Sequence, residues 1–328
     1  MLTAFQRRNG RLNGAVVETA PPDAVWLDLY NPSAAEIASV EAIAGVSLPS
    51  EAQMREIETS NRLYERGGAV FMTGTIISEA DSPRPVSRAA TFVLSPGSAE
   101  RPGRLVTIRH SQPRPFAVFA ERLAAQQNPS AAPELLLCGL WQAIIARSAD
   151  VVERLAAELD DLNDAVFQPA RRKRPTRTEE FRVVLSRLGA ANDMATRIHE
   201  SMFSLARVVG FPEQAAPERL CAEFRPLAHR VRRDIEALND QVEFLGDKIS
   251  FLLDATLGLV NVEQNAIIRI LSIAATVFLP PTLIASLYGM NFEFMPELAW
   301  PYGYPMALSV IALSALGPYL LFKLRGWL

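Results

Sequence analysis

The chain has 328 residues, with 33 Lys and Arg against 36 Asp and Glu, which gives a formal net charge of −3 at pH 7. Nucleic-acid-binding proteins usually present a basic surface, so this balance excludes DNA or RNA as the expected partner. Charged residues are dense up to Arg269 and sparse afterwards. The length and this uneven distribution predict a soluble body followed by a membrane part.

The cysteine pattern and the first residues indicate a cytoplasmic body. Cys138 and Cys221 occur without a C-x-x-C motif, which argues against a disulfide framework or a zinc site. Two buried thiols in a reducing compartment are the expectation. Met1 to Arg11 contains basic residues but lacks the apolar core of a signal peptide, so we expect the amino terminus to stay in the cytoplasm.

Residues 1–130 are predicted to form a cytoplasmic α/β domain. An apolar run at residues 24–29 ends at the turn signal Asn31-Pro32-Ser33. Ser33 and Glu36 have the spacing of a capping box, which predicts a helix start. Three β-branched runs separated by turns with Pro or Gly predict a sheet, at residues 69–77, 90–94 and 104–109. Their order leaves parallel and antiparallel pairing open.

Residues 131–212 are predicted to form a helical hairpin. Apolar residues recur at helical spacing from Leu135 to Phe167, and Gln168-Pro169 is expected to end this helix. A basic connector follows at residues 171–175. The second helix is expected from about Thr178 to Val209, ended by Gly210-Phe211-Pro212.

Residues 213–292 are predicted to form a stalk helix that continues into a first transmembrane helix. Apolar residues recur every three or four positions from Leu220 to Leu252, as in a coiled-coil seam. The runs 270–292 and 299–322 contain no charged residue, and each exceeds the roughly 20 apolar residues that cross a bilayer. Residues 293–328 then supply an external loop and a second transmembrane helix. The expected fold class is an α+β membrane protein.

Basic residues set the expected orientation. Lys248 and Arg269 precede the first span, Lys323 and Arg325 follow the second, and none lies between Arg269 and Lys323. The positive-inside rule therefore places both termini in the cytoplasm and the loop at residues 289–300 outside. The lipid bilayer is thus an expected partner of this two-span chain.

One stripe of the long helix carries polar residues into the first span. Its members are spaced three or four apart, and Leu271 lies beside them: Asp254, Gly258, Asn261, Asn265, Ile268, Ser272, Ala275, Leu279, Thr282 and Ser286. Polar residues within a span face protein or water rather than lipid. Several copies around an axis would let this stripe line a pore, with apolar rings that gate it by dewetting. Packing of helix on helix by small and polar residues is the alternative.

At Tyr288-Gly289-Met290-Asn291 the sequence resembles the CorA family of divalent-cation channels. The likeness extends over the first span from Gln264-Asn265, with Pro280 inside it, and over residues 295–298, 302–305 and 323–328. Residues 26–29 and 106–109 resemble weaker marks of the family's N-terminal domain. The strong part covers about residues 250–328.

The resemblance implies a homopentamer in the plasma (inner) membrane that takes up Mg2+ passively, with Co2+ and Ni2+ as further candidate ions. It implies a selectivity filter at Gly289, Met290 and Asn291, and no enzyme activity. Mg2+ is the expected transported and regulatory ion, and no cofactor is expected. The implied pore-lining residues are Asp254 at the cytoplasmic mouth, Asn265, Thr282, and the apolar gates Ile268, Leu271 and Leu279. The acidic residues Glu293 and Glu297 of the external loop are expected to concentrate cations near the mouth.

One departure from the family pattern concerns regulation. Arg230 stands where relatives gated by internal Mg2+ carry an acidic stalk residue, which leaves Asp234, Asp240 and Asp247 as candidate regulatory ligands. A ZntB-type zinc transporter is the nearest alternative, although such relatives usually lack the Met-Pro-Glu-Leu loop present here. A membrane-tethered coiled-coil scaffold is a second alternative. Scattered histidines and the absence of His-Glu-x-x-His or Gly-x-Ser-x-Gly argue against a hydrolase.

Overall fold

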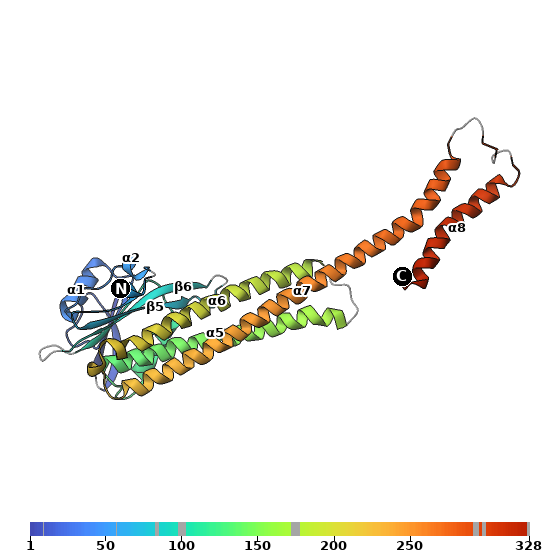
Figure 1. Cartoon of the computed structure of the whole chain (residues 1–328). Helices are drawn as coiled ribbons and strands as arrows, with labels where there is room; N and C mark the ends of the chain where they lie inside the picture. Colours follow the sequence, from blue (N-terminus) through green and yellow to red (C-terminus); the bar gives the residue numbers. More distant parts are fainter. Residues whose placement is uncertain are drawn as a thin grey trace. The chain divides into compact units, whose positions relative to one another are not determined.

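The computed structural model describes residues 1–8, 10–56, 58–82, 85–97, 103–171, 178–290, 295–296 and 300–326. They form two compact units, residues 1–175 with 182–253, and residues 176–181 with 254–328. The first unit contains a sheet and long helices, and the second contains apolar helices (Figure 1). The α+β fold class is therefore confirmed. The sheet strands are β1 (Leu2–Arg8), β2 (Arg11–Val17), β3 (Trp26–Tyr30), β4 (Leu63–Arg66), β5 (Ala69–Ser78), β6 (Val86–Ser95) and β7 (Arg104–Arg109).

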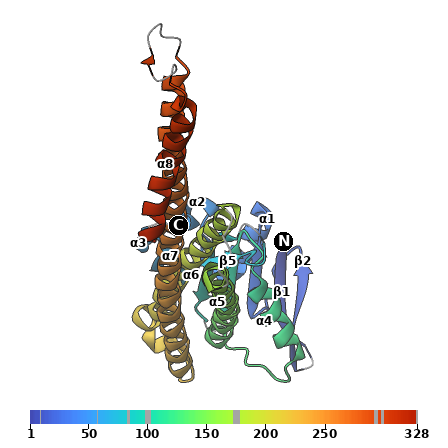
Figure 2. The same ribbon diagram turned by 90° about the vertical axis from the view of Figure 1, so that its right-hand side faces the viewer.

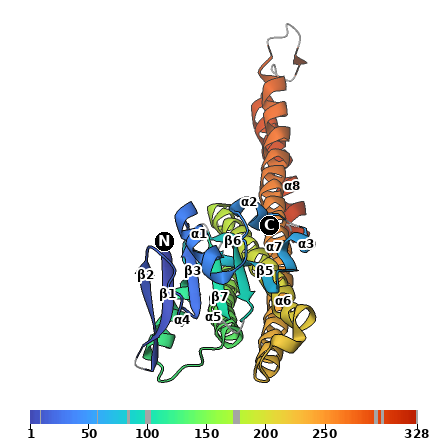
Figure 3. The ribbon, with the colours of Figure 1, turned by 90° about the vertical axis from the view of Figure 1, so that its left-hand side faces the viewer.

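The strands form one seven-stranded mixed sheet in the order β2-β1-β3-β7-β6-β5-β4, which Figure 3 shows from β2 to β5. The pair β3 and β7 is parallel, and every other neighbouring pair is antiparallel. The three runs predicted as strands are confirmed as β5, β6 and β7. Side chains alternate between the two faces of the sheet. Leu27, Leu29, Val106 and Ile108 join a core with Val40 of α1 (Ala34–Ala44) on one face.

The opposite face holds a buried polar network on the parallel pair. Asp28 accepts hydrogen bonds from Thr107 at 2.7 Å and from Arg109, whose Nη2 lies 2.9 Å from Oδ2. Trp26 donates to the Thr107 hydroxyl at 3.0 Å and stacks on Phe5. Each buried charge and hydroxyl of this network has a hydrogen-bond partner, which offsets the free-energy cost of removing Asp28 and Arg109 from water. The two sequence segments that resemble family marks, residues 26–29 and 106–109, thus meet in one network.

The first hairpin was missed by the sequence analysis. β1 and β2 pair in register from Leu2 with Val17 to Arg8 with Arg11, and Gly10 between them has φ of 74°. An Asn-Gly dipeptide between alternating runs is the usual signal of a tight hairpin, and it was present in the sequence. The capping box at Ser33 and Glu36, in contrast, is confirmed, with Ser33 N donating to Glu36 at 2.8 Å.

Besides α1, the described fold contains the shorter helices α2, α3, α4 and α8 and the long helices α5, α6 and α7. The long helices α5, α6 and the first part of α7 lie side by side, as Figures 1 and 2 show. Trp141 of α5 joins them to the sheet, because its ring meets Phe92 of β6 and Phe224 of α7 edge-on. The remaining bounds are α2 (Glu51–Met54), α3 (Thr59–Arg62), α4 (Arg114–Ala125), α5 (Pro133–Arg171), α6 (Thr178–Ala215), α7 (Phe224–Tyr288) and α8 (Gly303–Leu324), with a 3-10 turn η1 at Pro217–Arg219.

Two predicted helix ends are wrong. α5 continues through Pro169 to Arg171, and α6 continues through Gly210-Phe211-Pro212 to Ala215. A proline removes one helical hydrogen bond, but close to a C-terminus few bonds remain to be broken. In α6, the buried side chains of Val208 and Val209 hold this last turn against the core, and Ala216 N still donates to Pro212 O at 3.0 Å.

Three helices in the described part of the chain are long and apolar enough to cross a membrane, within Pro133–Phe167, α7 and α8. In α5, 61% of the most apolar segment is buried inside the protein. The corresponding share is only 6% in α7, and none of the segment in α8 is buried. The α5 segment is therefore a core helix. The candidate spans are the C-terminal part of α7 and α8, as the sequence predicts.

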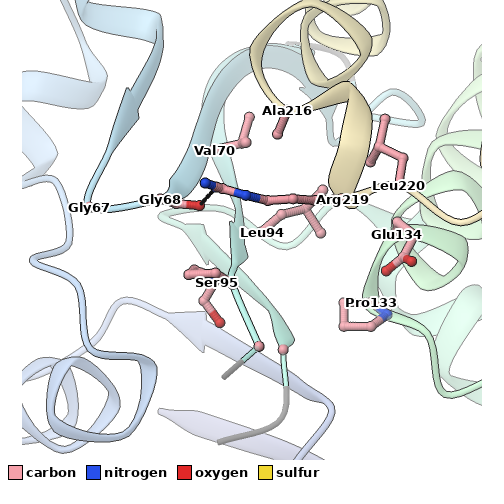
Figure 4. A pocket seen from close by; sticks show the side chains of 13 residues that line it. Gly67, Gly68, Val70, Leu94, Ser95, Pro133, Glu134, Ala216, Arg219 and Leu220 are labelled. Atoms are coloured by element: carbon pink, nitrogen blue, oxygen red, sulfur yellow. Dashed lines mark hydrogen bonds between the residues drawn. The ribbon is translucent and has the colours of Figure 1, made fainter. Parts of the chain in front are cut away.

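The turn η1 joins α6 to α7 and is tied to the sheet by Arg219. The Arg219 guanidinium donates to the Gly68 carbonyl at 2.5 Å and lies 3.2 Å from the Glu65 carboxylate. Figure 4 shows its side chain crossing a cavity of about 760 Å³ to reach the β4–β5 turn. The start of α7 is thus connected to the edge of the sheet by a charged contact.

The two cysteines are free thiols, with Cys138 buried and Cys221 half-buried, so the expectation of two buried thiols holds for the first alone. Burial raises the pKa of the Cys138 thiol to about 12, and burial also raises the pKa of Cys221. A raised thiol pKa keeps the unreactive protonated form present until the pH approaches that pKa.

We expect maleimide to label the native chain only at Cys221 at pH 7.5, slowly, and Cys138 only after denaturation. Labelling of each cysteine can be counted by mass spectrometry of the intact chain and its peptides. Cys221→Ser should remove all labelling of the native protein. Labelling of Cys138 in that folded variant would contradict the assignment.

Candidate pore-lining site

The long helix α7 carries the predicted site residues that can be placed. It runs without interruption over 65 residues, about 100 Å at 1.5 Å per residue. Its segment from residue 270 to 288 and the α8 segment from residue 303 to 322 contain no charged residue. The helix bounds agree with a stalk that continues into a candidate span.

One side of this part of α7 is less exposed than the others. Ile273 is 9% exposed, and half-buried residues follow on the same side at Val277, Pro281, Ile284 and Tyr288. α8 runs back in the opposite direction within the same unit (Figure 1). At 100° per residue, the side chains at these positions point roughly opposite to the predicted stripe. The covered side of α7 is thus not the side that carries the stripe.

Every member of the stripe is exposed in the single chain, from Asp254 and Asn265 to Ser286. The three predicted apolar gates have large exposed fractions: Ile268 60%, Leu271 70% and Leu279 66%. Leucine and isoleucine on a lipid-facing side would be equally exposed, whereas polar side chains such as Ser272 and Thr282 on the same side are less favourable against lipid. Protein or water is therefore the more favourable environment for this side of α7.

Two threonine hydroxyls in this segment bond to the helix backbone. Thr276 donates to Ser272 O at 2.8 Å, and Thr282 donates to Phe278 O at 2.7 Å. The hydroxyl proton is then engaged, so the lone pairs of Thr282 are available to accept from outside. Thr276, one turn after Ser272 and exposed, was not among the predicted residues although its four-residue spacing was visible in the sequence.

Two adjacent prolines, Pro280 and Pro281, lie inside α7 between the Leu279 and Thr282 positions. Neither has an N–H, so the carbonyls of Thr276 and Val277 lose their helical donors. Backbone carbonyls freed within a membrane segment are tolerated where neighbouring groups or water satisfy them. This is a second indication that the surroundings of this segment include polar partners.

The helix ends at Tyr288, directly before the predicted filter. Gly289 N donates to Ala285 O at 3.0 Å, and Met290 N to Leu287 O at 3.4 Å, so these residues close the last turn. A Cβ on Gly289 would lie 3.2 Å from Ala285 O, a tight contact that favours glycine here. Asn291, Glu293 and Glu297 lie outside the described residues.

The candidate regulatory ligands do not form a metal-binding cluster with other described residues. Asp234, Asp240 and Asp247 are exposed on α7, as is Arg230. No group of three or more His, Cys, Asp or Glu side chains that could hold a metal ion occurs among the described residues.

Together, a mixed α/β domain, a long helix that continues into an apolar segment, and a second apolar helix define a membrane protein with a C-terminal helical hairpin. The family described as "CorA-like Mg2+ transporter protein" matches residues 22–324. The "Magnesium transport protein CorA" of Escherichia coli K12 is 34% identical over 330 residues, covering 100% of both chains. This chain belongs to the CorA-like family.

Solved structures agree with the fold. The complete CorA magnesium transporter of Methanocaldococcus jannaschii covers 100% of this chain and 99% of its own, with a TM-score of 0.76 at 18% identity. The ZntB cytoplasmic domain of Vibrio parahaemolyticus covers 79% of this chain and 97% of its own, with a TM-score of 0.56 at 11% identity. At these identities the likeness concerns the fold alone, so it does not separate the magnesium from the zinc alternative.

Proposed function

We propose that this chain is the subunit of a homopentameric channel for passive uptake of Mg2+, with Co2+ and Ni2+ as further candidate ions. The observation that carries the proposal is the exposed stripe on α7, which alternates polar residues with large apolar ones on the side opposite the buried Ile273. One two-span chain cannot enclose a water path, whereas several copies around an axis can. The names of the curated relatives as magnesium transport proteins support the choice of ion.

The chemistry of the stripe suits a hydrated cation. Mg2+ exchanges its water ligands reluctantly, so a pore can recognise the waters rather than the bare ion. Bound water presents hydrogens, which need acceptors, and the Thr282 hydroxyl and the Asn265 amide oxygen offer them without a fixed charge. Gly289, Met290 and Asn291 are proposed to form the outer filter, and Asp254 the inner mouth.

The proposed transport is driven by the membrane potential and requires no chemical energy source. A divalent ion moving inward gains about 4–5 kcal/mol per 100 mV of membrane potential. Rings of Ile268, Leu271 and Leu279 would oppose this flow when they exclude water. We propose that both termini are cytoplasmic and that Glu293 and Glu297 attract cations to the outer mouth.

Regulation by internal Mg2+ is proposed to involve carboxylates of two neighbouring subunits. Asp234, Asp240 and Asp247 are exposed and have no cluster partner in the described part of their own chain. Arg230 in the same helix favours a site displaced from the position that relatives use, because a cation next to the ligands weakens divalent binding.

The deciding experiment is ion flux into proteoliposomes that contain the purified chain. We expect Mg2+ flux that rises with inside-negative potential and is independent of a pH gradient, and weaker flux of Co2+ and Ni2+. Preference for Zn2+ with dependence on the pH gradient would support a ZntB-type transporter instead. No flux of any ion would support a scaffold.

A second prediction concerns the apolar gate. Leu271→Gly should raise Mg2+ leak at high internal Mg2+, because a wider and more easily wetted ring lowers the barrier. Lowering that barrier by about 1.4 kcal/mol would raise flux about tenfold. Ile270→Gly carries the same helix penalty on another side of α7 and is the matched control. If both variants keep the wild-type sensitivity to internal Mg2+, the gate lies elsewhere.

A further inference from the structure

A polar pocket of about 360 Å³ lies in the N-terminal domain, far in sequence from the pore residues. It opens at the end of the sheet where the parallel strands β3 and β7 finish, since Asn31 and His110 directly follow them. In open sheets with parallel strands, ligands bind outside the carboxyl ends of those strands. Its lining comes from α2 and the residue after it, from α3, from β5 and β6, and from the positions that follow β3 and β7: Asn31, Glu51, Met54, Arg55, Arg62, Thr75, Ser87, Arg88, Ala89 and His110.

The lining has an excess of positive charge. The lining contains three arginines, Arg55, Arg62 and Arg88, and one carboxylate. That carboxylate, Glu51, already forms an ion pair with Arg55. Within the described part of the chain, Arg62 and Arg88 form no ion pair. Burial and the nearby Arg207 lower the pKa of Arg62, as expected for a cation without a compensating anion. The Arg62 guanidinium donates to the Glu56 carbonyl and to the Thr75 hydroxyl, which are both neutral, so an anion that reaches it would stabilise its charge.

Neutral groups of the pocket can add hydrogen bonds. The Ser87 hydroxyl is buried and has no hydrogen-bond partner among the described residues, although it lines the cavity. The His110 ring is held by Asn31, with Nδ1 3.0 Å from Oδ1, which leaves its other nitrogen for a ligand. Buried polar groups in folded proteins normally have a hydrogen-bond partner, so the Ser87 hydroxyl indicates that a ligand or water would bond to it in this pocket.

We propose that this pocket binds a small phosphate-bearing anion, with Arg62 and Arg88 as the charged ligands and Ser87 and His110 as additional hydrogen-bond partners. Arginine recognises phosphate through paired N–H groups. Arg62 and Arg88 do not pair with the Glu51 carboxylate of the lining, so they favour a group with more than one negative charge. The cavity volume fits pyrophosphate or the phosphate end of a nucleotide. Carboxylate ligands are disfavoured because they offer fewer acceptor oxygens to the same lining.

The test is titration calorimetry of the full chain in detergent with pyrophosphate, ADP and inorganic phosphate, without divalent metal. We expect one site per chain, with pyrophosphate or ADP bound more tightly than inorganic phosphate. The double variant Arg62→Gln/Arg88→Gln should bind at least about tenfold more weakly. Arg11→Gln, an exposed arginine on β2 outside the pocket, is the matched control and should bind like wild type.

Three results would overturn the proposal. The wild type could bind none of the three anions, the double variant could bind as the wild type does, or Arg11→Gln could lose as much affinity as the double variant. Arg88→Glu provides a second variant on an exposed side chain, so folding is not at risk. Its binding should be weaker still, because a negative charge replaces a positive one at the same position.

Discussion

Asn291→Ala should abolish Mg2+ uptake while the assembly remains intact. In the proposed pentamer this change removes five amide oxygens that accept hydrogen bonds from the waters of the ion. At about 0.5–1.5 kcal/mol for each bond, the total loss is at least about 2.5 kcal/mol, a decrease in flux of roughly 70-fold or more. Flux into proteoliposomes and the mass of the purified assembly are the two measurements.

Two further variants sharpen this prediction. Asn192→Ala removes an exposed asparagine of α6 and should leave flux unchanged. Asn291→Asp replaces the neutral ring by a charged one, which should slow release of the ion and reduce the maximal flux at saturating Mg2+. Wild-type flux in Asn291→Ala would remove this residue from the filter.

Asp28→Ala should destabilise the N-terminal domain more than any loss of a surface ion pair. Asp28 and Arg109 are 7% and 10% exposed, and the change leaves the guanidinium buried without its carboxylate. Removing one partner of a buried pair costs about 3–5 kcal/mol. The rings of Tyr30 and Phe116, whose centroids lie 4.9 and 4.8 Å from the guanidinium carbon, cannot replace a full negative charge.

The shift in Tm, followed by tryptophan fluorescence of the full chain in detergent, measures this effect. Asp193→Ala breaks an exposed helix pair with Arg197 and should cost less than about 1 kcal/mol. The double variant Asp28→Leu/Arg109→Met removes both charges and should recover much of the loss. Equal Tm values for Asp28→Ala and Asp193→Ala would show that the buried network contributes little to stability.

The elements that the sequence predicts well are those with local signals. The capping box at Ser33, the β-branched runs of β5 to β7 and the charge-free runs of α7 and α8 each depend on neighbouring residues only. Helix ends at Pro169 and Pro212 were wrong because packing of the last turn offsets one lost hydrogen bond. The hairpin β1–β2 also has a local signal, the Asn-Gly dipeptide between its strands, although the sequence analysis does not predict it.

Other features depend on register and could not be read from one sequence. Asp28 and Arg109 are 81 positions apart and meet only because β3 and β7 pair in parallel with Asp28 opposite Thr107. The stripe on α7 was predictable from helical spacing alone. Which side of α7 is covered depends on tertiary packing, and the burial of Ile273 supplied that information.

The charge-free segments of α7 and α8 have a consequence for electrical behaviour. A protein senses membrane voltage by moving charged side chains through the field, at about 2.3 kcal/mol per elementary charge per 100 mV. Between residues 270 and 288 and between residues 303 and 322 there is no side chain that could act as such a gating charge. In the proposed channel, the membrane potential would then change the driving force on the ion without changing the open probability of the gate. Single-channel open probability should therefore stay constant across potentials at which the current itself changes steeply.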